Sequence, residues 1–586
     1  MTKPRLRGPV PNSQARHFSE VLFNTVADRP DDTAFQFLPD GEEEERSLTW
    51  SQLERRAVSI AAALSEIASP GDRVLLLFVP GLEFIEAFLA CQLVGVIAVA
   101  TYPPRVERAW QGQRLVAAIA GNCRPAVVLT GGRFASMIQN LVKDLPELSS
   151  ARWLNSDLVP ETSKPNRTAR ASGNEVSLLQ YTSGSTGDPK GVVITHANLV
   201  HNEELMRLAF GHTEETEYAA GVCWLPPYHD MGLMGHILHG VYIGFPCAVI
   251  PPMGILQWPV RWLKTISKYR ADASGGPNFI YELCSHRISQ ELREGLDLSH
   301  WNIAGVGAEP IRAQTVEDFI RAYEPYGFRP SAFEPSYGLA EATLCVTASN
   351  PREAPVIREF PRNLGQGDDI RTGASPAVEP QRLVGCGHSW LDQTLLIVDP
   401  ETQKPCPGKV GEIWVSGPSV AAGYWERPTE TAETFGQQLA TGGEERFLRT
   451  GDLGFEDDGH LFVVGRLKDL IIIRGKNFHP HDLELAVQSI HPAFRLDCGA
   501  AFGIESSGEE QLVIVQEIDR RSRGLVADDL KALVRKAVLQ NFDLRPHEII
   551  FIRNGTLPKT TSGKVQRRET RRRYLAGELA VWDSGK

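Results

Sequence analysis

The chain has 586 residues, more than one compact core usually holds, so we expect at least two domains. Its 42% hydrophobic and 23% charged residues are typical of a soluble globular protein, and a net charge of −11 argues against binding to nucleic acid. The nine cysteines form no C-x-x-C pair, so we expect neither a zinc site nor a disulfide framework, but reduced thiols in a cytoplasmic protein.

The first part of the chain is expected to contain buried strands separated by helices. RVLLLFV (73–79) predicts a strand, GLEFIEAFLACQLV (81–94) a helix and GVIAVATY (95–102) the next strand. Similar apolar runs follow near 127, 247, 273 and 303. This alternation predicts an α/β fold with parallel βαβ sheets. Charges and prolines interrupt the apolar runs, so no transmembrane segment is expected, and the basic N-terminus lacks the apolar core of a signal peptide.

A glycine- and hydroxyl-rich loop is the strongest chemical signal. VSLLQYT (176–182) predicts a strand that runs directly into SGSTGDPKG (183–191). Glycines let the backbone approach an anion closely, while the exposed N–H groups and hydroxyls donate hydrogen bonds. The loop is not a Walker A motif, because Pro189 precedes Lys190 and Gly191 follows it; a flexible linker is the alternative interpretation. The predicted phosphate-binding residues are Thr182, Ser183, Gly184, Ser185, Thr186, Gly187 and Lys190.

TSGSTGDPKG resembles the phosphate-loop signature of the adenylate-forming superfamily, which contains acyl-CoA synthetases, peptide-synthetase adenylation domains and luciferases. The resemblance implies a large N-terminal AMP-binding domain (1–465), a hinge (466–469) and a small mobile α+β C-terminal lid domain (470–586). It also implies ATP as a substrate and Mg²⁺ as a cofactor.

Motifs in the large domain match the expected nucleotide site in order. SYGLAEATL resembles the stretch in which Tyr337, beside Gly338, stacks on adenine and Glu341 binds magnesium; Ala340 replaces the usual threonine, so no hydroxyl role is assigned there. RTGDLGF is expected to place Asp452 between a glycine turn and a strand, where it would bind both ribose hydroxyls. By the same resemblance, VGAEP (Gly307, Ala308 and Glu309) lines the adenine site and Arg466 contacts ribose or phosphate.

Two further residues are predicted to act on the reacting groups. Lys564, in LPKTTSGKVQR, resembles the lysine that reaches the α-phosphate and the substrate carboxylate; a solvated surface lysine is the alternative. His229 lies in WLPPYHDMGL, and by resemblance it separates the acyl tunnel from the nucleotide. A catalytic dyad with Asp230 is weaker, because adjacent residues seldom face each other, and a simple turn before a buried helix is a third interpretation.

Several stretches narrow the resemblance to the fatty acyl-AMP ligase branch. WLPPYHDMGLMG, SGGPNFIYELC and EPSYGLAEATL carry it, and a long polar segment at about 350–382 resembles the insertion of these ligases. The branch implies activation of a medium- or long-chain fatty acid as acyl-AMP, with release of pyrophosphate. The acyl group would then pass to the phosphopantetheine thiol of a separate acyl carrier protein, since the chain has no G-x-D-S-L attachment motif.

Three alternatives remain, and the small domain is predicted from its own pattern. They are a fatty acyl-CoA synthetase, an amino-acid-activating domain and a catalytically inactive nucleotide-binding protein. A metal-dependent hydrolase is excluded, because the histidines of this chain lack ligand spacing such as H-E-x-x-H. EQLVIVQEI predicts a strand in the small domain, and the basic tail RRETRRRY the solvated face of a helix. Helical spacing links Leu530, Leu533, Val534 and Val538.

Overall fold

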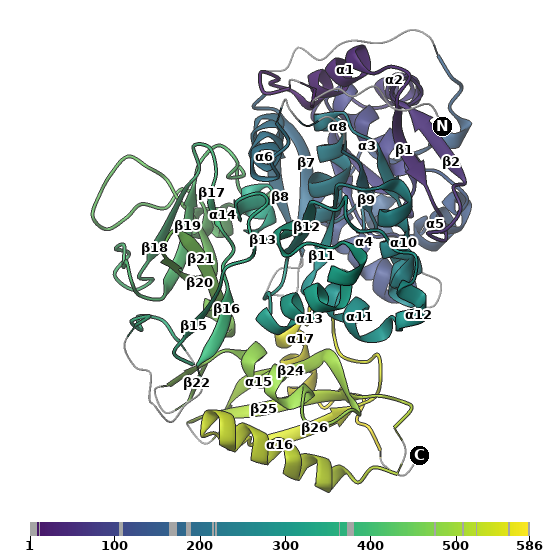
Figure 1. Cartoon of the computed structure of the whole chain (residues 1–586). Coiled ribbons are helices and arrows are strands. Elements are labelled where there is room, and N and C mark those ends of the chain that lie inside the picture. The colour runs from purple at the N-terminus through teal and green to yellow at the C-terminus, as the bar shows by residue number, and fades with distance from the viewer. Residues whose placement is uncertain are drawn as a thin grey trace.

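The computed structural model describes residues 9–583, except 11, 105–108, 163–172, 183–188, 214–215, 217–218, 363, 372–379, 474–475, 507–508, 523 and 561–562. Figure 1 shows helices and strands mixed in the purple-to-teal part, a β-rich green part beside it, and a small part in yellow-green. We call residues 9–466 the large region and residues 470–583 the small region.

The first sheet of the large region has the strand order β6-β5-β3-β4-β7-β8. All its neighbours pair in parallel except β7 and β8, which form an antiparallel hairpin. The predicted strands near 74, 97, 127 and 176 are therefore confirmed. Their bounds are β3 Arg73–Leu77, β4 Ile97–Ala100, β5 Val127–Thr130, β6 Arg152–Asn155, β7 Val176–Thr182 and β8 Lys190–Thr195.

The second sheet has nine strands in the order β17-β14-β13-β12-β11-β9-β10-β1-β2. Its strands from β13 to β1 run parallel, and the antiparallel pairs lie at its two ends. The bounds are β1 Thr33–Phe37, β2 Arg46–Thr49, β9 Gly221–Cys223, β10 Cys247–Val249, β11 Ala273–Pro277, β12 Ile303–Gly307, β13 Phe333–Gly338, β14 Cys345–Ala348 and β17 His388–Ser389.

Helices cover both sheets (Figure 1). The predicted helix α3 (Leu82–Val94) is apolar on nearly all sides and accordingly almost completely buried, and it ends at Gly95, whose φ of 77° suits glycine. The other α- and π-helices of the large region are α1 Phe18–Asp28, α2 Trp50–Ser65, α4 Ala109–Cys123, α5 Ala135–Val142, α6 His196–Ala209, α7 Asp230–Gly232, the π-helix η4 Leu233–Leu238, α8 His239–Ile243, α9 Pro252–Gln257, α10 Val260–Tyr269, α11 Asn278–Arg287, α12 Gln290–Arg293, α13 Ala313–Tyr323 and α14 Pro428–Thr434.

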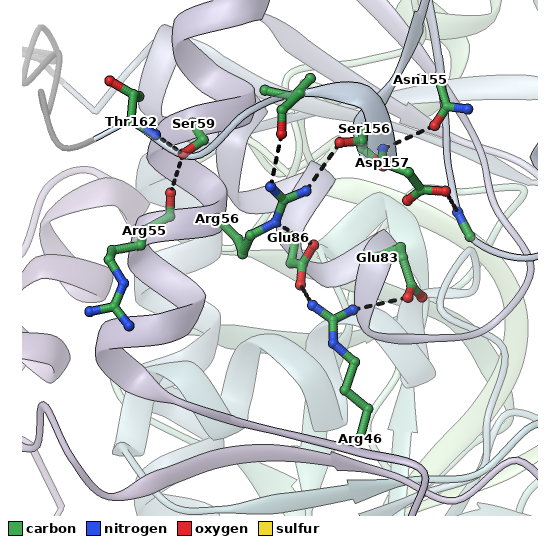
Figure 2. Close-up of polar contacts among 12 residues, drawn as sticks. Arg46, Arg55, Arg56, Ser59, Glu83, Glu86, Asn155, Ser156, Asp157 and Thr162 are labelled. Carbon is green, nitrogen blue, oxygen red and sulfur yellow. Dashed lines mark hydrogen bonds and ion pairs between the residues drawn. The ribbon is translucent and has the colours of Figure 1, made fainter.

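A buried carboxylate ties α2, α3 and β2 together (Figure 2). Glu86 is 1% exposed and lies 2.5 Å from Arg46 Nη2 and 3.6 Å from Arg56 Nε. Arg46 also binds Glu83, and Arg56 donates to the carbonyl of Ser156. Burial raises the pKa of Glu86, which the two arginines oppose. Removing this carboxylate would take one partner from each arginine, although Arg46 would keep Glu83 and Arg56 the carbonyl of Ser156.

The polar segment at 350–382, predicted as an insertion, contains regular structure. Strands β15 (Ile357–Phe360) and β16 (Gln381–Val384) pair in antiparallel fashion at its ends. Phe360, Leu364 and Ile370 enter an apolar cluster with the sheet β18-β19-β20-β21. Buried apolar side chains among the charges therefore anchor this segment. That sheet consists of β18 Thr394–Val398, β19 Gly411–Ser416, β20 Leu448–Asp457 and β21 His460–Arg466.

The small region has a core of its own. Sheet β24-β25-β26 packs with α15 and α16 around an apolar cluster separate from that of the large region. The predicted helix is α16 (Ala527–Phe542), where Leu530, Val534 and Val538 are buried; Leu533 is 42% exposed, so its place in the apolar pattern was wrong. The remaining elements are η8 Leu467–Asp469, β22 Ile471–Ile473, β23 Lys476–Phe478, α15 Pro480–Gln488, β24 Phe494–Ser506, β25 Glu509–Ile518, β26 Glu548–Ile552 and α17 Arg567–Leu575.

Among the helices that the structure describes, none combines the length and apolarity needed to cross a membrane. All nine cysteines lie within the described ranges and are free thiols, eight of them buried.

Candidate active site

The β7–β8 hairpin holds the two ends of the predicted phosphate loop. Thr182 pairs with Lys190 in the register of this hairpin, so the loop between them leaves and returns at one edge of the sheet. The predicted phosphate ligands Ser183, Gly184, Ser185, Thr186 and Gly187 lie outside the described residues.

Tyr424 links Lys190 to Glu341, and sequence reasoning missed it. Its hydroxyl donates to Glu341 Oε1 at 2.8 Å, and Lys190 Nζ lies 4.8 Å from the centre of its ring. The backbone beside it is bonded to β8, since Trp425 N–H donates to the carbonyl of Gly191. A hydrogen bond and a cation–π contact thus place a phosphate-loop cation and the predicted metal ligand on one aromatic side chain.

A tight turn after β13 presents Glu341. Gly338 is required at its start, because a Cβ there would lie 1.9 Å from the carbonyl oxygen of Leu344. Thr343 closes the turn with a φ of 68°, which is uncommon for a β-branched residue and occurs often at functional sites. The Glu341 carbonyl accepts from Ala421 N–H at 2.9 Å. The carboxylate is thereby held on a constrained backbone.

The donor set around Glu341 fits a hard cation. Its Oε1 accepts one hydrogen bond, from Tyr424, whereas its Oε2 accepts none from the described residues. A carboxylate oxygen is a ligand that Mg²⁺ prefers, and nucleotide phosphates usually supply others. Within the described ranges, no three His, Cys, Asp or Glu side chains form a cluster that could hold a metal by themselves.

Asp452 lies between two polar partners brought from different elements. Tyr337 Oη donates to Asp452 Oδ2 at 2.8 Å, and Arg466 Nε donates to Oδ1 at 2.9 Å. Burial and the charge of Asp452 raise the pKa of Tyr337, and the same carboxylate raises that of Arg466. Each carboxylate oxygen keeps a lone pair for a further donor such as a ribose hydroxyl.

The position of Asp452 corrects one expectation. It was predicted between a glycine turn and a strand, but it lies inside the ten-residue strand β20, as does Gly451. The pairing of β20 with β19 shifts between Glu412 and Trp414, and this irregularity accommodates Gly451, whose φ is 73°. Pairing of Asp452 with Arg466 on β21 is what orients the carboxylate.

The VGAEP stretch lies at the same sheet edge as Gly338. Strands β12 and β13 are parallel neighbours, and Gly307 ends the first as Gly338 ends the second. Ala308 follows with a φ of 65°. Glu309 accepts the backbone N–H of Phe279 at 2.7 Å. Burial raises the pKa of Glu309 to about 7, and neighbouring Asp497 also raises it.

Lys564 of the small region exerts its charge on His229 and Glu309 of the large region. Lys564 lies in an exposed loop held by Thr560, whose N–H donates to the Lys564 carbonyl at 2.8 Å. Its positive charge lowers the pKa of both His229 and Glu309. For His229, desolvation is the larger cause, and adjacent Asp230 opposes it. The small region therefore directs a cation toward the end of β12 and the loop before α7.

The structure thus gathers five of the predicted residues into two groups. Tyr337, Asp452 and Arg466 form one bonded group, and Lys190 and Glu341 meet through Tyr424 in another. Besides Tyr424, sequence reasoning missed Arg312 and Asp497, which bind each other across the two regions. These three residues occur outside the recognised motifs, so no local signal pointed to them.

Comparison with known proteins identifies the class of this site. Residues 22–425 match the family described as "AMP-binding enzyme", and residues 468–584 match "Disco-interacting protein 2-like, AMP domain". The medium-chain-fatty-acid–(acyl-carrier-protein) ligase JamA of Moorena producens is 40% identical over 558 residues, 94% of each chain. Ligase TtuA of Teredinibacter turnerae, with the same descriptive name, is 34% identical over 94% of this chain and 93% of its own.

Solved structures extend the similarity to three dimensions. A fatty acyl-adenylate ligase from L. pneumophila, in complex with acyl adenylate and pyrophosphate, has 37% identity and a TM-score of 0.73, covering 98% of this chain and 99% of its own. A structure from work on fatty acyl-adenylate ligases of E. coli and L. pneumophila has 30% identity and a TM-score of 0.86, covering 97% and 99%. The chain therefore belongs to the AMP-binding enzyme family, in its fatty acyl-AMP ligase branch.

Proposed function

We propose that this protein activates a fatty acid with ATP, forming acyl-AMP and pyrophosphate, and passes the acyl group to the phosphopantetheine thiol of a separate acyl carrier protein. The observation that carries the proposal is the bonded group of Tyr337, Asp452 and Arg466, with the charge of Lys564 acting on nearby Glu309. The names of the relatives JamA and TtuA support the fatty acid and the carrier protein.

The first step joins two anions, so the site must offset their repulsion. The fatty-acid carboxylate attacks the α-phosphate of ATP, a P–O bond forms, and the bond to pyrophosphate breaks. We propose that Lys564 contacts the α-phosphate and the attacking carboxylate. Lys190 and the loop that begins at Thr182 would bind the outer phosphates. Fixed positive groups of this kind typically lower a barrier by about 2.7–4 kcal/mol each.

Mg²⁺ would enter with the triphosphate and be held by Glu341. When bound, it would neutralise phosphate charge. The chain itself contributes a carboxylate placed by the turn after Gly338 and by the hydroxyl of Tyr424. The other oxygen of Glu341, Oε2, accepts no hydrogen bond from a described residue, which supports its assignment as a metal ligand.

The nucleoside would lie at the buried polar group. Asp452 would accept hydrogen bonds from the ribose hydroxyls. Arg466 holds the carboxylate of Asp452 and would contact ribose or phosphate. Tyr337 would present its ring to adenine, because its hydroxyl is held by Asp452. Gly307, Ala308 and Glu309 would line the other side of the base, where the left-handed backbone at Ala308 turns the chain.

The small region would act as a mobile lid about a hinge at 466–469, with a large domain at 1–465 and a lid domain at 470–586. The separate core of the small region supports this division, and a second family match begins at residue 468. The solved structure with 37% identity has a lower TM-score, 0.73, than the structure with 30% identity, 0.86. This order is expected if the large and small domains are oriented differently relative to each other in the two structures. Lys564 would withdraw after acyl-AMP forms and admit the carrier thiol.

The acyl chain would extend into an apolar tunnel beyond His229, near the π-helix η4 and the strand β11. Desolvation favours the neutral imidazole of His229, which suits a wall between the nucleotide and an apolar chain. Each buried methylene would contribute about 0.8 kcal/mol to binding. The nine free cysteines support a reducing, cytoplasmic setting.

The thiol that accepts the acyl group distinguishes the proposed ligase from a fatty acyl-CoA synthetase. Purified protein would be incubated with dodecanoate, α-labelled ATP and Mg²⁺, alone, with free CoA, or with a carrier protein bearing its phosphopantetheine thiol. We expect labelled acyl-AMP that the carrier protein consumes and free CoA does not. Conversion by CoA would make the protein an acyl-CoA synthetase, and absence of any acyl-AMP across a series of fatty acids would refute lipid activation.

A further inference from the structure

Among the described residues, two sets of contacts join the small region to the large one, and they lie in different places. The first is beside residues 466–469, where His479 Nε2 lies 2.6 Å from the carbonyl oxygen of Leu364. The second is far from it in sequence, where Arg312 of the large region binds Asp497 of the small region. Figure 1 shows α13, which begins after Arg312, next to the small region. The second set lies near Glu309, a predicted site residue on which Arg312 and Asp497 both exert their charges.

Arg312 is oriented by the large region alone. Its backbone N–H donates to Asn278 Oδ1 at 3.1 Å, and its Nη1 donates to Glu282 Oε2 at 2.8 Å. Its other terminal nitrogen, Nη2, donates to Asp497 Oδ1. The guanidinium therefore has one fixed partner on its own side and offers a fork of donors to the other side.

Asp497 is presented by an irregularity in β24. The strand departs from regular pairing with β25 between Phe494 and Gly499, and Asp497 within this bulge has a φ of 52°. Its N–H donates to Gln488 Oε1 at 2.6 Å. Bulges commonly redirect a side chain, and aspartate tolerates the left-handed conformation better than most residues. The bulge thus directs a carboxylate out of the small region toward Arg312.

This ion pair lies within electrostatic reach of the predicted reaction centre. The charges of Asp497, Arg312 and Lys564 all act on Glu309, which stands three residues before Arg312. Asp497 and Lys564 both belong to the small region, so a movement that separates Asp497 from Arg312 also changes the place of Lys564. The position of the catalytic lysine and the state of this ion pair are therefore coupled.

We propose that the Arg312–Asp497 ion pair is a latch that holds the small region in the orientation in which Lys564 reaches the site, so that both residues position the adenylation step without touching substrate. This inference rests on the proposed function. The latch is reversible by construction: on opening, Arg312 keeps Glu282, and Asp497, already 27% exposed, is rehydrated. Because the pair is only partly buried, opening does not strand an isolated charge.

The test compares Asp497→Asn with Glu317→Gln. Asparagine removes the charge but tolerates the positive φ, so the bulge is retained. Glu317 lies on α13 and binds Arg382 within the large region, which makes it a matched ion pair that does not join the regions. Two half-reactions would be measured separately: dodecanoate-dependent exchange of labelled pyrophosphate into ATP, and single-turnover transfer from supplied dodecanoyl-AMP to the carrier protein.

We expect Asp497→Asn to lower the exchange rate about tenfold, equivalent to about 1.4 kcal/mol, while transfer from supplied acyl-AMP is unchanged or faster. Glu317→Gln should alter neither rate. Equal losses in both half-reactions, or no loss of exchange, would overturn the latch. Arg312→Gln combined with Asp497→Asn should cost no more than the larger single effect, since both remove one interaction.

A second readout does not depend on turnover. Amide hydrogen exchange of residues 306–316 and 494–500 would be compared in the same variants without substrates. We expect faster exchange at both segments in Asp497→Asn and wild-type exchange in Glu317→Gln. If the wild-type protein made no acyl-AMP, the proposed function would fail, yet this exchange comparison would still decide whether the pair holds the two regions together.

Discussion

The two halves of the candidate site are built differently. The half from the large region is bonded before any ligand arrives: Asp452 is held by Tyr337 and Arg466, and Glu341 by Tyr424. The half from the small region is one lysine, Lys564, in an exposed loop. The groups proposed to recognise the nucleotide thus belong to the large region, whereas the lysine proposed to act at the reacting atoms belongs to the small region. Recognition and reaction can therefore be separated by mutation.

Loss of Lys564 should have the largest effect. Lys564→Ala removes a cation from the developing charge, so we expect the adenylation rate to fall by about 10²–10³-fold, following the usual effect of one such donor. Transfer from supplied acyl-AMP should remain. Lys559→Ala is the matched control, because Lys559 lies in the same segment but donates to Cys498 at 3.3 Å. A comparable loss in the control would show that the segment, not the charge, matters.

Asp452→Asn should affect recognition more than reaction. The amide has one acceptor fewer and no charge, and the loss of hydrogen bonds to a charged group usually costs about 1.5–3 kcal/mol. We therefore expect the KM for ATP to rise by about 10- to 100-fold, with a smaller change in kcat. A fall in kcat at unchanged KM would contradict the placement of ribose at Asp452.

Tyr424→Phe isolates the hydrogen bond to Glu341. The ring beneath Lys190 is kept, so only the hydroxyl contact of 2.8 Å is lost. A typical hydrogen bond contributes about 0.5–1.5 kcal/mol, so the Mg²⁺ concentration for half-maximal rate should rise about three- to tenfold. Tyr424→Leu, which also removes the cation–π contact, should in addition raise the KM for ATP. Identical behaviour of both variants would refute the role of the ring.

Substitution of Glu309 should have the smallest effect, a change in how the stability of the protein depends on pH. Its folded pKa of about 7 exceeds the usual value of 4.5 because of burial, so the folded state binds the extra proton between these values. Stability from this group is then fully present below pH 4.5 and is lost as pH rises through 7. Glu309→Gln should flatten the decline of Tm between pH 5 and pH 7 relative to wild type. Parallel Tm curves would contradict the raised pKa.

Local patterns predicted the elements well where a strand or helix is buried on nearly all sides. The run 73–79 and the helix after Gly81 were recognisable because continuous apolar residues leave few other structures possible. The polar segment at 350–382 was harder, because its apolar residues Phe360, Leu364 and Ile370 are sparse and pack against distant strands. Leu533 shows the converse, since apolar spacing alone placed an exposed residue with the buried ones.

Sequence by itself determined the α/β class, the family motifs and the residue types available for phosphate, ribose and metal. These are local properties: a loop of glycines and hydroxyls is readable in ten consecutive residues. Only the tertiary structure decided that Tyr424 joins Lys190 to Glu341 and that Arg312 meets Asp497. Those contacts connect segments 83 to 234 residues apart. Such pairings depend on how sheets and regions pack, which no local pattern records.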